Sequence, residues 1–146
     1  MIKIFELLNK YHNLNLIICG KGNLAHKIKE ICLNKNNIYY LGYVSDIDMN
    51  HFLNVVDYFI SFSCYEGLPM TTLESINYGV QYILSDIPAH RYFINNNLGN
   101  GIIIDLNNID ISKTLGYINT KHSKNKNNDF SNFHWDMIIK TYIKLF

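Results

Sequence analysis

The sequence predicts an α/β fold with a doubly wound, Rossmann-like parallel sheet. Two observations lead to this prediction: five short apolar runs recur along the chain, and stretches with helical spacing of apolar residues separate them. Short apolar strands that alternate with helices are typical of parallel pairing through right-handed crossovers. The chain has 146 residues, of which 48% are apolar, so it suits a single domain with a buried core.

The first half of the chain is expected to contain three helices and two strands. Ile4, Leu7, Leu8 and Tyr11 recur at helical spacing within residues 2–12 and form one apolar face. The strand 16–19 ends at Gly20-Lys21-Gly22, and the helix 23–34, the strand 38–41 and the helix 47–56 follow. The apolar residues that should point inward from the second and third helices are Leu24, Ile28, Ile31, Cys32, Met49, Phe52, Leu53 and Val56.

The second half is expected to contain three strands, a short helix and three longer helices. The strand 58–61 leads through a loop to Pro69 and a helix from about Met70 to Tyr78, with Gly79 as its C-cap. The strands 82–85 and 102–104 enclose the short helix. Helices near 109–119 and 131–145 close the chain, and the polar stretch 120–129 between them is expected to be a flexible loop.

Composition excludes several classes of function. The formal net charge is only +1, which gives no electrostatic reason to bind nucleic acid or a membrane surface. No apolar run approaches the roughly 18 residues of a membrane span, and no signal peptide is evident, so the protein is expected in the cytoplasm. Cys19, Cys32 and Cys64 lack metal-site spacing and are expected to be free thiols, and the six scattered histidines predict no zinc site.

Ligands of such sheets bind beyond the carboxyl ends of the strands, where three segments of this chain belong. Gly20-Lys21-Gly22 allows close backbone approach to a phosphate, although a plain tight turn explains it equally well. Residues 85–91 include Asp86, which caps or turns the chain, and Pro88, which opens a helix. His90 and Arg91 could contact an anion, but a solvated helix face is the favoured interpretation.

The remaining segment, residues 63–74, places two carboxylates around a helix start. Glu66 lies in the loop and Glu74 lies one turn into the helix, so both could accept hydrogen bonds from sugar hydroxyls while the helix N-terminus receives a phosphate. Spacing alone favours ordinary roles, with Glu74 on a solvated face and Glu66 as an acid near a helix N-terminus. Asp46-Ile47-Asp48 spells a metal-nucleotide motif, but Ser45 and Asp48 approximate a capping box there.

At the segment that carries Glu66 and Glu74 the sequence resembles a known family. The stretch from Ser63 to Gly79 resembles the E-x7-E signature of retaining family-4 (group 1) glycosyltransferases, specifically the C-terminal, nucleotide-sugar-binding domain of the GT-B fold. Further segments resemble this family in the same order along the chain. They are residues 16–22, 40–44, 56–57, 85–91 and 133–142.

The resemblance implies a role for each matching residue. Glu66 would be the catalytic residue that holds donor-sugar hydroxyls, and Glu74 would bind the ribose hydroxyls. The nucleobase would lie beside residues 41–44, Tyr43 among them. The remaining donor-binding positions, which would contact the sugar or the diphosphate, are Gly20, Gly22, Gly67, Leu68, Met70, Thr71 and Thr72. The expected substrate is a nucleotide-diphosphate sugar, with no cofactor and no metal.

The resemblance also implies parts that this chain lacks. Family members have two Rossmann-like domains, and residues 1–146 correspond to most of the second. The acceptor domain would be absent, as would the first strand of the nucleotide domain and the Arg and Lys that follow it. We therefore expect a truncated or split product of low stability that needs a complementing chain, unless the strands that flank the missing one pair directly.

Three functions follow from the sequence. The first is the donor-binding domain of a glycosyltransferase that acts with retention, in surface polysaccharide or glycolipid synthesis, at the inner face of the membrane through the missing domain. The second is a non-catalytic sugar-nucleotide-binding module that serves a partner chain. The third is a sugar-nucleotide epimerase of similar fold, against which the spacing of Glu66 and Glu74 argues.

Overall fold

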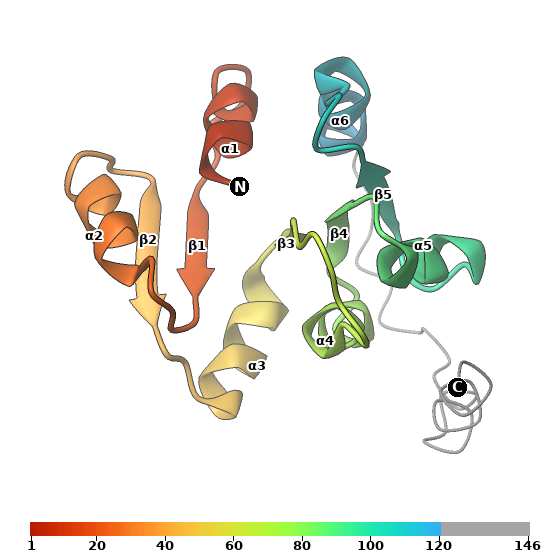
Figure 1. Cartoon of the computed structure of the whole chain (residues 1–146), viewed down its shortest axis with the longest axis horizontal. Coiled ribbons are helices and arrows are strands. Elements are labelled where there is room, and N and C mark those ends of the chain that lie inside the picture. Colours follow the sequence, from red (N-terminus) through yellow and green to blue (C-terminus); the bar gives the residue numbers. More distant parts are fainter. Residues whose placement is uncertain (121–146) are drawn as a thin grey trace. The chain divides into compact units, whose positions relative to one another are not determined.

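The computed structural model describes residues 1–120, in which helices and strands alternate as predicted (Figure 1). All strand pairs in this part are parallel, so the α/β class is confirmed. The expected helix 131–145 lies outside the described residues. The elements are α1 (Ile2–Asn9), β1 (Leu16–Cys19), α2 (Ala25–Leu33), β2 (Ile38–Gly42), α3 (Asp46–Val55), β3 (Tyr58–Ser61), α4 (Met70–Asn77), β4 (Gln81–Ser85), α5 (Pro88–Asn95), β5 (Gly101–Ile104) and α6 (Ile111–Asn119).

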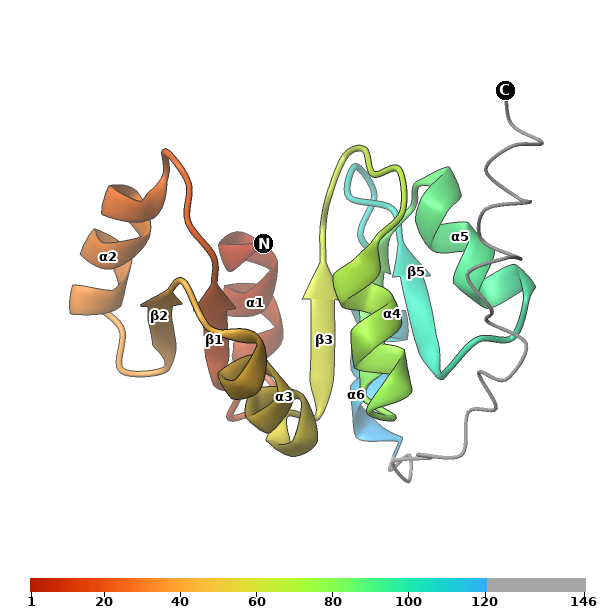
Figure 2. The same cartoon turned by 90° about the horizontal axis from the view of Figure 1, so that it is seen from below.

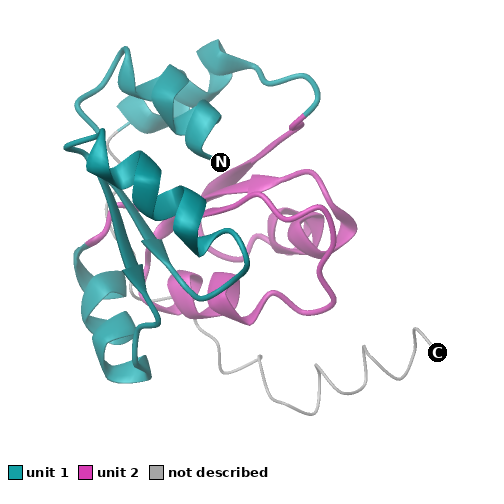
Figure 3. Cartoon of the chain, turned by 60° about the vertical axis from the view of Figure 1, so that its left-hand side comes forward, with its two compact units in different colours: residues 1–55, 107–121 teal, residues 56–106, 122–146 magenta. Residues whose placement is uncertain are grey.

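The described residues divide into two compact units (Figure 3). Unit 1 contains Met1–Val55 and the segment that begins at Asn107, and it includes β1 and β2. Unit 2 contains Val56–Leu106 and includes β3, β4 and β5. Each unit therefore has a parallel sheet of its own.

In unit 1, β1 and β2 pair in register from Leu16 opposite Ile38, and the register shifts after Ile18 so that Cys19 lies opposite Gly42. Phe5 of α1 packs against the buried residues of this sheet. The predicted face of the first helix was wrong in part, because Leu7 and Tyr11 are exposed. The buried residues of α1 are Ile4, Phe5 and Leu8.

The second helix also differs from its prediction. Leu24 was expected to point inward but is exposed, because α2 begins only after it and Leu24 is the N-cap residue. Ile28, Ile31 and Cys32 pack against the unit 1 core but are only partly buried.

In unit 2, β4 is the central strand and all five of its residues are buried, which suits a strand paired on both sides. Figure 2 shows α4 in front of the sheet, between β3 and β5. Tyr82 and Leu84 project to one face, because successive strand residues alternate. That face packs with Leu73 and Ile76 of α4 and with Phe93 of α5. The helices α4 and α5 are thus fixed against the strand that leads to the candidate site.

The strands of the described region form two sheets, in the orders β1-β2 and β3-β4-β5. Within unit 1, β1 pairs with β2, and within unit 2, β3 pairs with β4. Direct pairing of the strands that would flank the missing one stays a prediction. No helix in residues 1–120 is both long and apolar enough to cross a bilayer.

Tyr82 is fully buried and fixes the packing between β4 and β5. Its hydroxyl donates a hydrogen bond to the Leu98 carbonyl at 2.8 Å, and burial raises its pKa to about 12. Gly101 lies opposite Tyr82 in the sheet, where a Cβ atom would stand 2.0 Å from Cδ2 of the ring. Glycine is therefore required at position 101 by space rather than by backbone conformation.

We expect Gly101→Ala to destabilise the protein by about 1–3 kcal/mol, because the added methyl group overpacks a rigid buried ring. Urea unfolding followed by circular dichroism measures the change. Gly116→Ala in α6 is the matched control, because a Cβ there meets no atom within 4 Å and alanine favours a helix by up to about 1 kcal/mol. Equal stability of the two variants would contradict the steric explanation.

Candidate functional site

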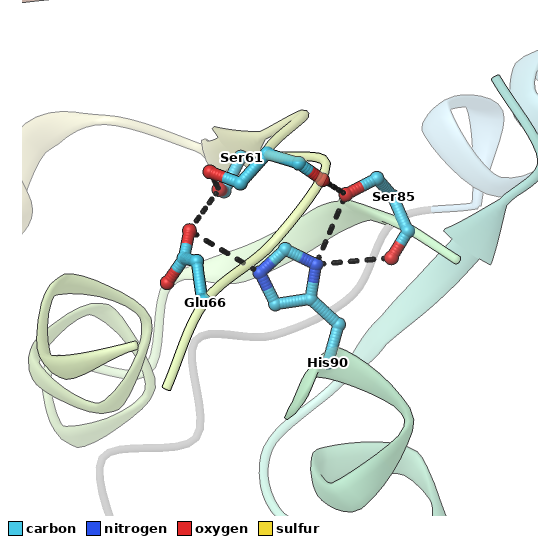
Figure 4. Close-up of polar contacts among 5 residues, drawn as sticks. Ser61, Glu66, Ser85 and His90 are labelled. Atoms are coloured by element: carbon cyan, nitrogen blue, oxygen red, sulfur yellow. Dashed lines mark hydrogen bonds and ion pairs between the residues drawn. The ribbon is translucent and has the colours of Figure 1, made fainter. Parts of the chain in front are cut away.

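Two loops of unit 2 meet at the carboxyl edge of its sheet. Because β3 and β4 are parallel, Ser61 at the end of β3 lies opposite Leu84, and Ser85 ends β4. The loop after β3 carries Glu66, and the helix after β4 carries His90. Figure 4 shows these side chains turned toward one another.

Glu66 is held in a half-buried position, with 23% of its side chain exposed. Its Oε1 atom accepts a hydrogen bond from Oγ of Ser61 at 3.0 Å and lies 3.6 Å from Nε2 of His90. Ser61 Oγ also contacts Oγ of Ser63 at 3.2 Å. A carboxylate fixed in this way, yet reached by solvent, can accept further hydrogen bonds from a ligand.

His90 is fully buried, so the predicted solvated helix face was wrong for this residue. Its Nδ1 atom lies 2.9 Å from the carbonyl oxygen of Ser85 and 3.2 Å from Ser85 Oγ (Figure 4). The Ser85 hydroxyl in turn donates to the carbonyl of Ser63. The sequence signal that could have found His90 is its i, i+3 spacing to Phe93, the other buried residue of α5.

Arg91, the neighbour of His90, is exposed and pairs with Asp86. Its Nη2 atom donates to Oδ2 of Asp86 at 2.9 Å, and its Nε donates to Oδ1. The hydrogen bonds from Arg91 hold the pKa of the Asp86 carboxyl below its usual value. Asp86 therefore does not cap α5, whose N-cap residue is Ile87 and whose first residue is Pro88, as expected.

The helix α4 begins at Met70, and Pro69 is its N-cap residue with no side-chain hydrogen bond. Helix N-termini attract anions through free N–H groups and the helix dipole. Glu74, Thr71, Met70 and Gly67 are exposed around this end of the helix, and Leu68 packs against the unit 2 core. Thr72 is fully buried, and its Oγ1 atom has no hydrogen-bond partner among the described residues.

In unit 1 the structure brings Gly20 and Tyr43 into one loop cluster. The Gly20 N–H donates to the Gly42 carbonyl at 2.6 Å. Gly20 has a φ of +118°, a backbone conformation that residues other than glycine rarely adopt. Lys21 places its Nζ atom 4.6 Å from the centre of the exposed Tyr43 ring. Gly22 lies in the same turn, and a Cβ atom there would meet open space. The cluster combines an aromatic face, a cation and a permissive backbone.

The Asp46-Ile47-Asp48 motif forms the predicted cap. Asp48 N–H donates to Ser45 Oγ at 3.2 Å, and Ser45 Oγ donates to the Asp48 carboxylate at 2.7 Å. Within residues 1–120, no three His, Cys, Asp or Glu side chains gather where they could hold a metal ion.

All three cysteines are free thiols, as predicted. Cys64 is exposed in the loop that carries Glu66, whereas Cys19 is partly buried at the end of β1. Burial raises the pKa of the Cys19 thiol.

Comparison with known proteins decides the family. The family model described as "Glycosyl transferases group 1" matches residues 1–131, which is most of the chain. The chain belongs to this family. The resemblance found in the sequence is thus confirmed at the level of group 1 glycosyltransferases.

The relatives of this chain are longer than the regions that match it. An uncharacterised glycosyltransferase of Methanocaldococcus jannaschii, MJ1059, is 35% identical over 91 residues, which are 59% of this chain and 22% of the relative. The Escherichia coli protein named UDP-Gal:alpha-D-GlcNAc-diphosphoundecaprenol alpha-1,3-galactosyltransferase is 32% identical over 98 residues, 64% of this chain and 24% of the relative. A third relative, O-antigen biosynthesis glycosyltransferase WbnH of Escherichia coli, is 30% identical over 115 residues, which are 77% of this chain and 32% of the relative.

The crystal structure of TarM shares the fold. Its TM-score is 0.66 at 23% sequence identity, and the match covers 99% of this chain and 31% of TarM. This group 1 glycosyltransferase chain therefore spans between about a fifth and a third of the length of the proteins that it matches.

We expect Thr72→Val to leave the stability of this family member unchanged or to raise it by about 1 kcal/mol, because the substitution removes a buried hydroxyl without a partner and keeps the side-chain shape. Thermal unfolding measures the effect. Thr71→Val is the control at an exposed neighbour and should change stability by no more than about 0.5 kcal/mol. Clear destabilisation by Thr72→Val alone would show that the hydroxyl has a partner.

Proposed function

We propose that this chain is the donor-binding part of a retaining, family-4 glycosyltransferase of the GT-B fold, which transfers a sugar from a nucleotide-diphosphate sugar to an acceptor. The observation that carries the proposal is the pair Glu66 and Glu74 on either side of the α4 N-terminus, in a chain of the group 1 family. Glu66 is fixed but reached by solvent, and Glu74 is exposed. Such carboxylates suit polyol hydroxyls, and the helix N-terminus between them suits a phosphate.

Each group then has a chemical task. Glu66 accepts hydrogen bonds from hydroxyls of the donor sugar, with Gly67, Leu68 and Met70 beside the same sugar. Thr71 lies by the diphosphate with an exposed side chain, and Thr72 lies at the same helix start but is buried, with its N–H donating to the Pro69 carbonyl. Glu74 accepts from the ribose hydroxyls.

The unit 1 cluster is assigned to the nucleotide. The exposed ring of Tyr43 offers a stacking surface for the nucleobase. Gly20 and Gly22 allow the backbone to approach the phosphates. Lys21 lies over the Tyr43 ring and adds a positive charge beside this surface.

In the transfer step the bond between the anomeric carbon and the diphosphate oxygen breaks, and the acceptor oxygen forms the new bond while its proton passes to the departing diphosphate oxygen. The anomeric centre passes through an oxocarbenium-like transition state, and the new bond keeps the configuration of the old one. Negative charge develops on the departing diphosphate and is met by N–H groups and cations. The chemistry proposed needs no cofactor or metal.

The proposed setting is surface polysaccharide or glycolipid synthesis in the cytoplasm, at the inner face of the membrane. Support comes from the Escherichia coli relatives, one named for transfer to a diphosphoundecaprenol-linked sugar and one for O-antigen biosynthesis. We further propose a complementing chain that supplies the acceptor domain and a strand with Arg and Lys. Its support is that this chain spans only between about a fifth and a third of the length of the proteins that it matches.

We expect saturable binding of one class of nucleotide sugar, with UDP-galactose as the first donor to test beside GDP- and ADP-sugars. Isothermal titration calorimetry on the folded protein gives the Kd. Glu74→Ala should weaken binding about tenfold or more, because it removes a charged acceptor. Glu30→Ala, at an exposed position of α2, is the matched control and should leave the Kd unchanged. Binding that Glu74→Ala does not alter would defeat the proposal.

Turnover tests the enzyme assignment and the complementing chain together. We expect sugar transfer when a chain that carries an acceptor domain is supplied, with equal rates in EDTA and with the donor's anomeric configuration kept in the product. Product analysis by NMR gives both the rate and the configuration. Donor binding without transfer under these conditions would favour the non-catalytic binding module, and loss of transfer in EDTA would overturn the metal-independent chemistry.

A further inference from the structure

We propose that His90 is a positioning residue for Glu66: its Nε2 atom donates a hydrogen bond to Oε1 and fixes the carboxylate in the orientation that a ligand meets. The observation is a fully buried imidazole whose Nε2 atom has no hydrogen-bond partner in the described residues and lies 3.6 Å from Glu66 Oε1. Only the ligand that Glu66 contacts rests on the function proposed above; the contact between the two side chains does not.

The contacts of the other ring nitrogen, Nδ1, show that it carries a proton. Nδ1 lies 2.9 Å from the Ser85 carbonyl oxygen, which can only accept a hydrogen bond, so Nδ1 carries a proton. Ser85 Oγ, 3.2 Å from Nδ1, gives its own proton to the Ser63 carbonyl and can accept from the ring as well. The ring is thereby fixed with Nδ1 toward β4 and Nε2 toward Glu66.

The surroundings of Nε2 then determine its role. Oε1 of Glu66 lies 3.6 Å from Nε2 and already accepts a hydrogen bond from Ser61. A ring nitrogen that faced this oxygen with a lone pair would place two acceptors against each other in a buried site, which is unfavourable. With a proton on Nε2 as well as on Nδ1 the ring is an imidazolium, its contact with the Glu66 carboxylate is an attractive ion pair, and a small rotation of the Glu66 side chain closes 3.6 Å to hydrogen-bond distance. Such contacts are often long before a ligand binds and tighten afterwards.

The two carboxylate oxygens of Glu66 then have different roles. Oε1 receives both contacts that the described residues make with the carboxylate, one from Ser61 and one from His90. Oε2 is left for a ligand in a side chain that is 23% exposed. Two donors on one oxygen restrict the rotation of the carboxylate and so lower the entropy lost when a ligand binds.

Two substitutions at position 90 separate this role from simple core filling. In His90→Gln the amide nitrogen can take the place of Nε2 and donate to Glu66. In His90→Asn the amide nitrogen takes the place of Nδ1, so the bond to Ser85 is kept and the bond to Glu66 is lost. We expect His90→Gln to bind the nucleotide sugar within about threefold of the natural protein, and His90→Asn to bind about tenfold more weakly or worse.

The second measurement needs no sugar and observes the ring of His90 itself. With ¹⁵N-labelled histidine in the full chain, NMR reports whether each ring nitrogen carries a proton, and His90→Asn assigns the signals. We expect both nitrogens of His90 to be protonated, and Glu66→Gln to shift the Nε2 signal while the Nδ1 signal stays. An Nε2 signal that does not respond to Glu66→Gln overturns the proposal, as does equal donor binding by the Gln and Asn variants at equal thermal stability.

The two arms also separate this proposal from the proposed function. If Glu66→Gln moves the Nε2 signal but no nucleotide sugar binds the natural protein, the positioning contact stands and the function proposed for Glu66 fails. If the sugar binds and the Nε2 signal is the same in the natural protein and in Glu66→Gln, the proposed donor-binding function stands and the positioning role of His90 fails.

Discussion

The hydrogen bonds of Ser85 connect three segments of unit 2 on which the candidate site depends. Ser85 ends the central strand β4, its hydroxyl donates to the Ser63 carbonyl in the loop after β3, and its carbonyl and hydroxyl oxygens meet the His90 ring on α5. Each buried polar group left without a partner costs about 1–3 kcal/mol, a large share of a stability of about 5–15 kcal/mol. The loop that presents Glu66 is therefore fixed from the strand beside it as well as from its own residues.

This connection requires parallel strands in one register. The pairing of Ser61 with Leu84 sets the ends of β3 and β4 level, so the loops that follow both strands leave the same edge. A shift by one residue would turn the side chains of β4 to opposite faces and separate Tyr82 and Leu84 from α4 and α5. Core packing thus enforces the register on which the polar contacts at the strand ends depend.

Much of the fold could be predicted from the sequence because its strands and helices have strong local signals. The buried strands and the Glu66–Glu74 spacing were visible, since apolar runs, glycine turns and motif spacing are local properties. The buried face of α1 was visible only in part: Ile4 and Leu8 are buried as predicted, but Leu7 is exposed, and Tyr11 lies beyond the end of the helix at Asn9. Helical spacing indicates which residues share a face, but it does not determine where the last turn stops.

The role of His90 could not be predicted for a different reason. A histidine beside Arg91 and Pro88 has the local character of a solvated helix start, and Arg91 is indeed exposed. His90 is buried because Ser85, on the adjacent strand β4, supplies its polar contacts, and the Ser85 hydroxyl is itself satisfied by the carbonyl of Ser63, 22 residues away in the sequence. Polar residues at the ends of two adjacent parallel strands are the sequence signal for such a cluster, and here they are Ser61 and Ser85.

The thiol of Cys64 is exposed and is therefore a better site for chemical labelling than Cys19 and Cys32, which are partly buried. Thiolates, not thiols, react with alkylating reagents, so the partly buried Cys19, whose pKa is raised by burial, should react slowly. Cys64 adjoins Ser63, whose carbonyl receives the Ser85 hydroxyl. A fluorophore attached at Cys64 would therefore sit on the loop that carries Glu66, and its emission would follow the movement of that loop without any change to the residues that hold it.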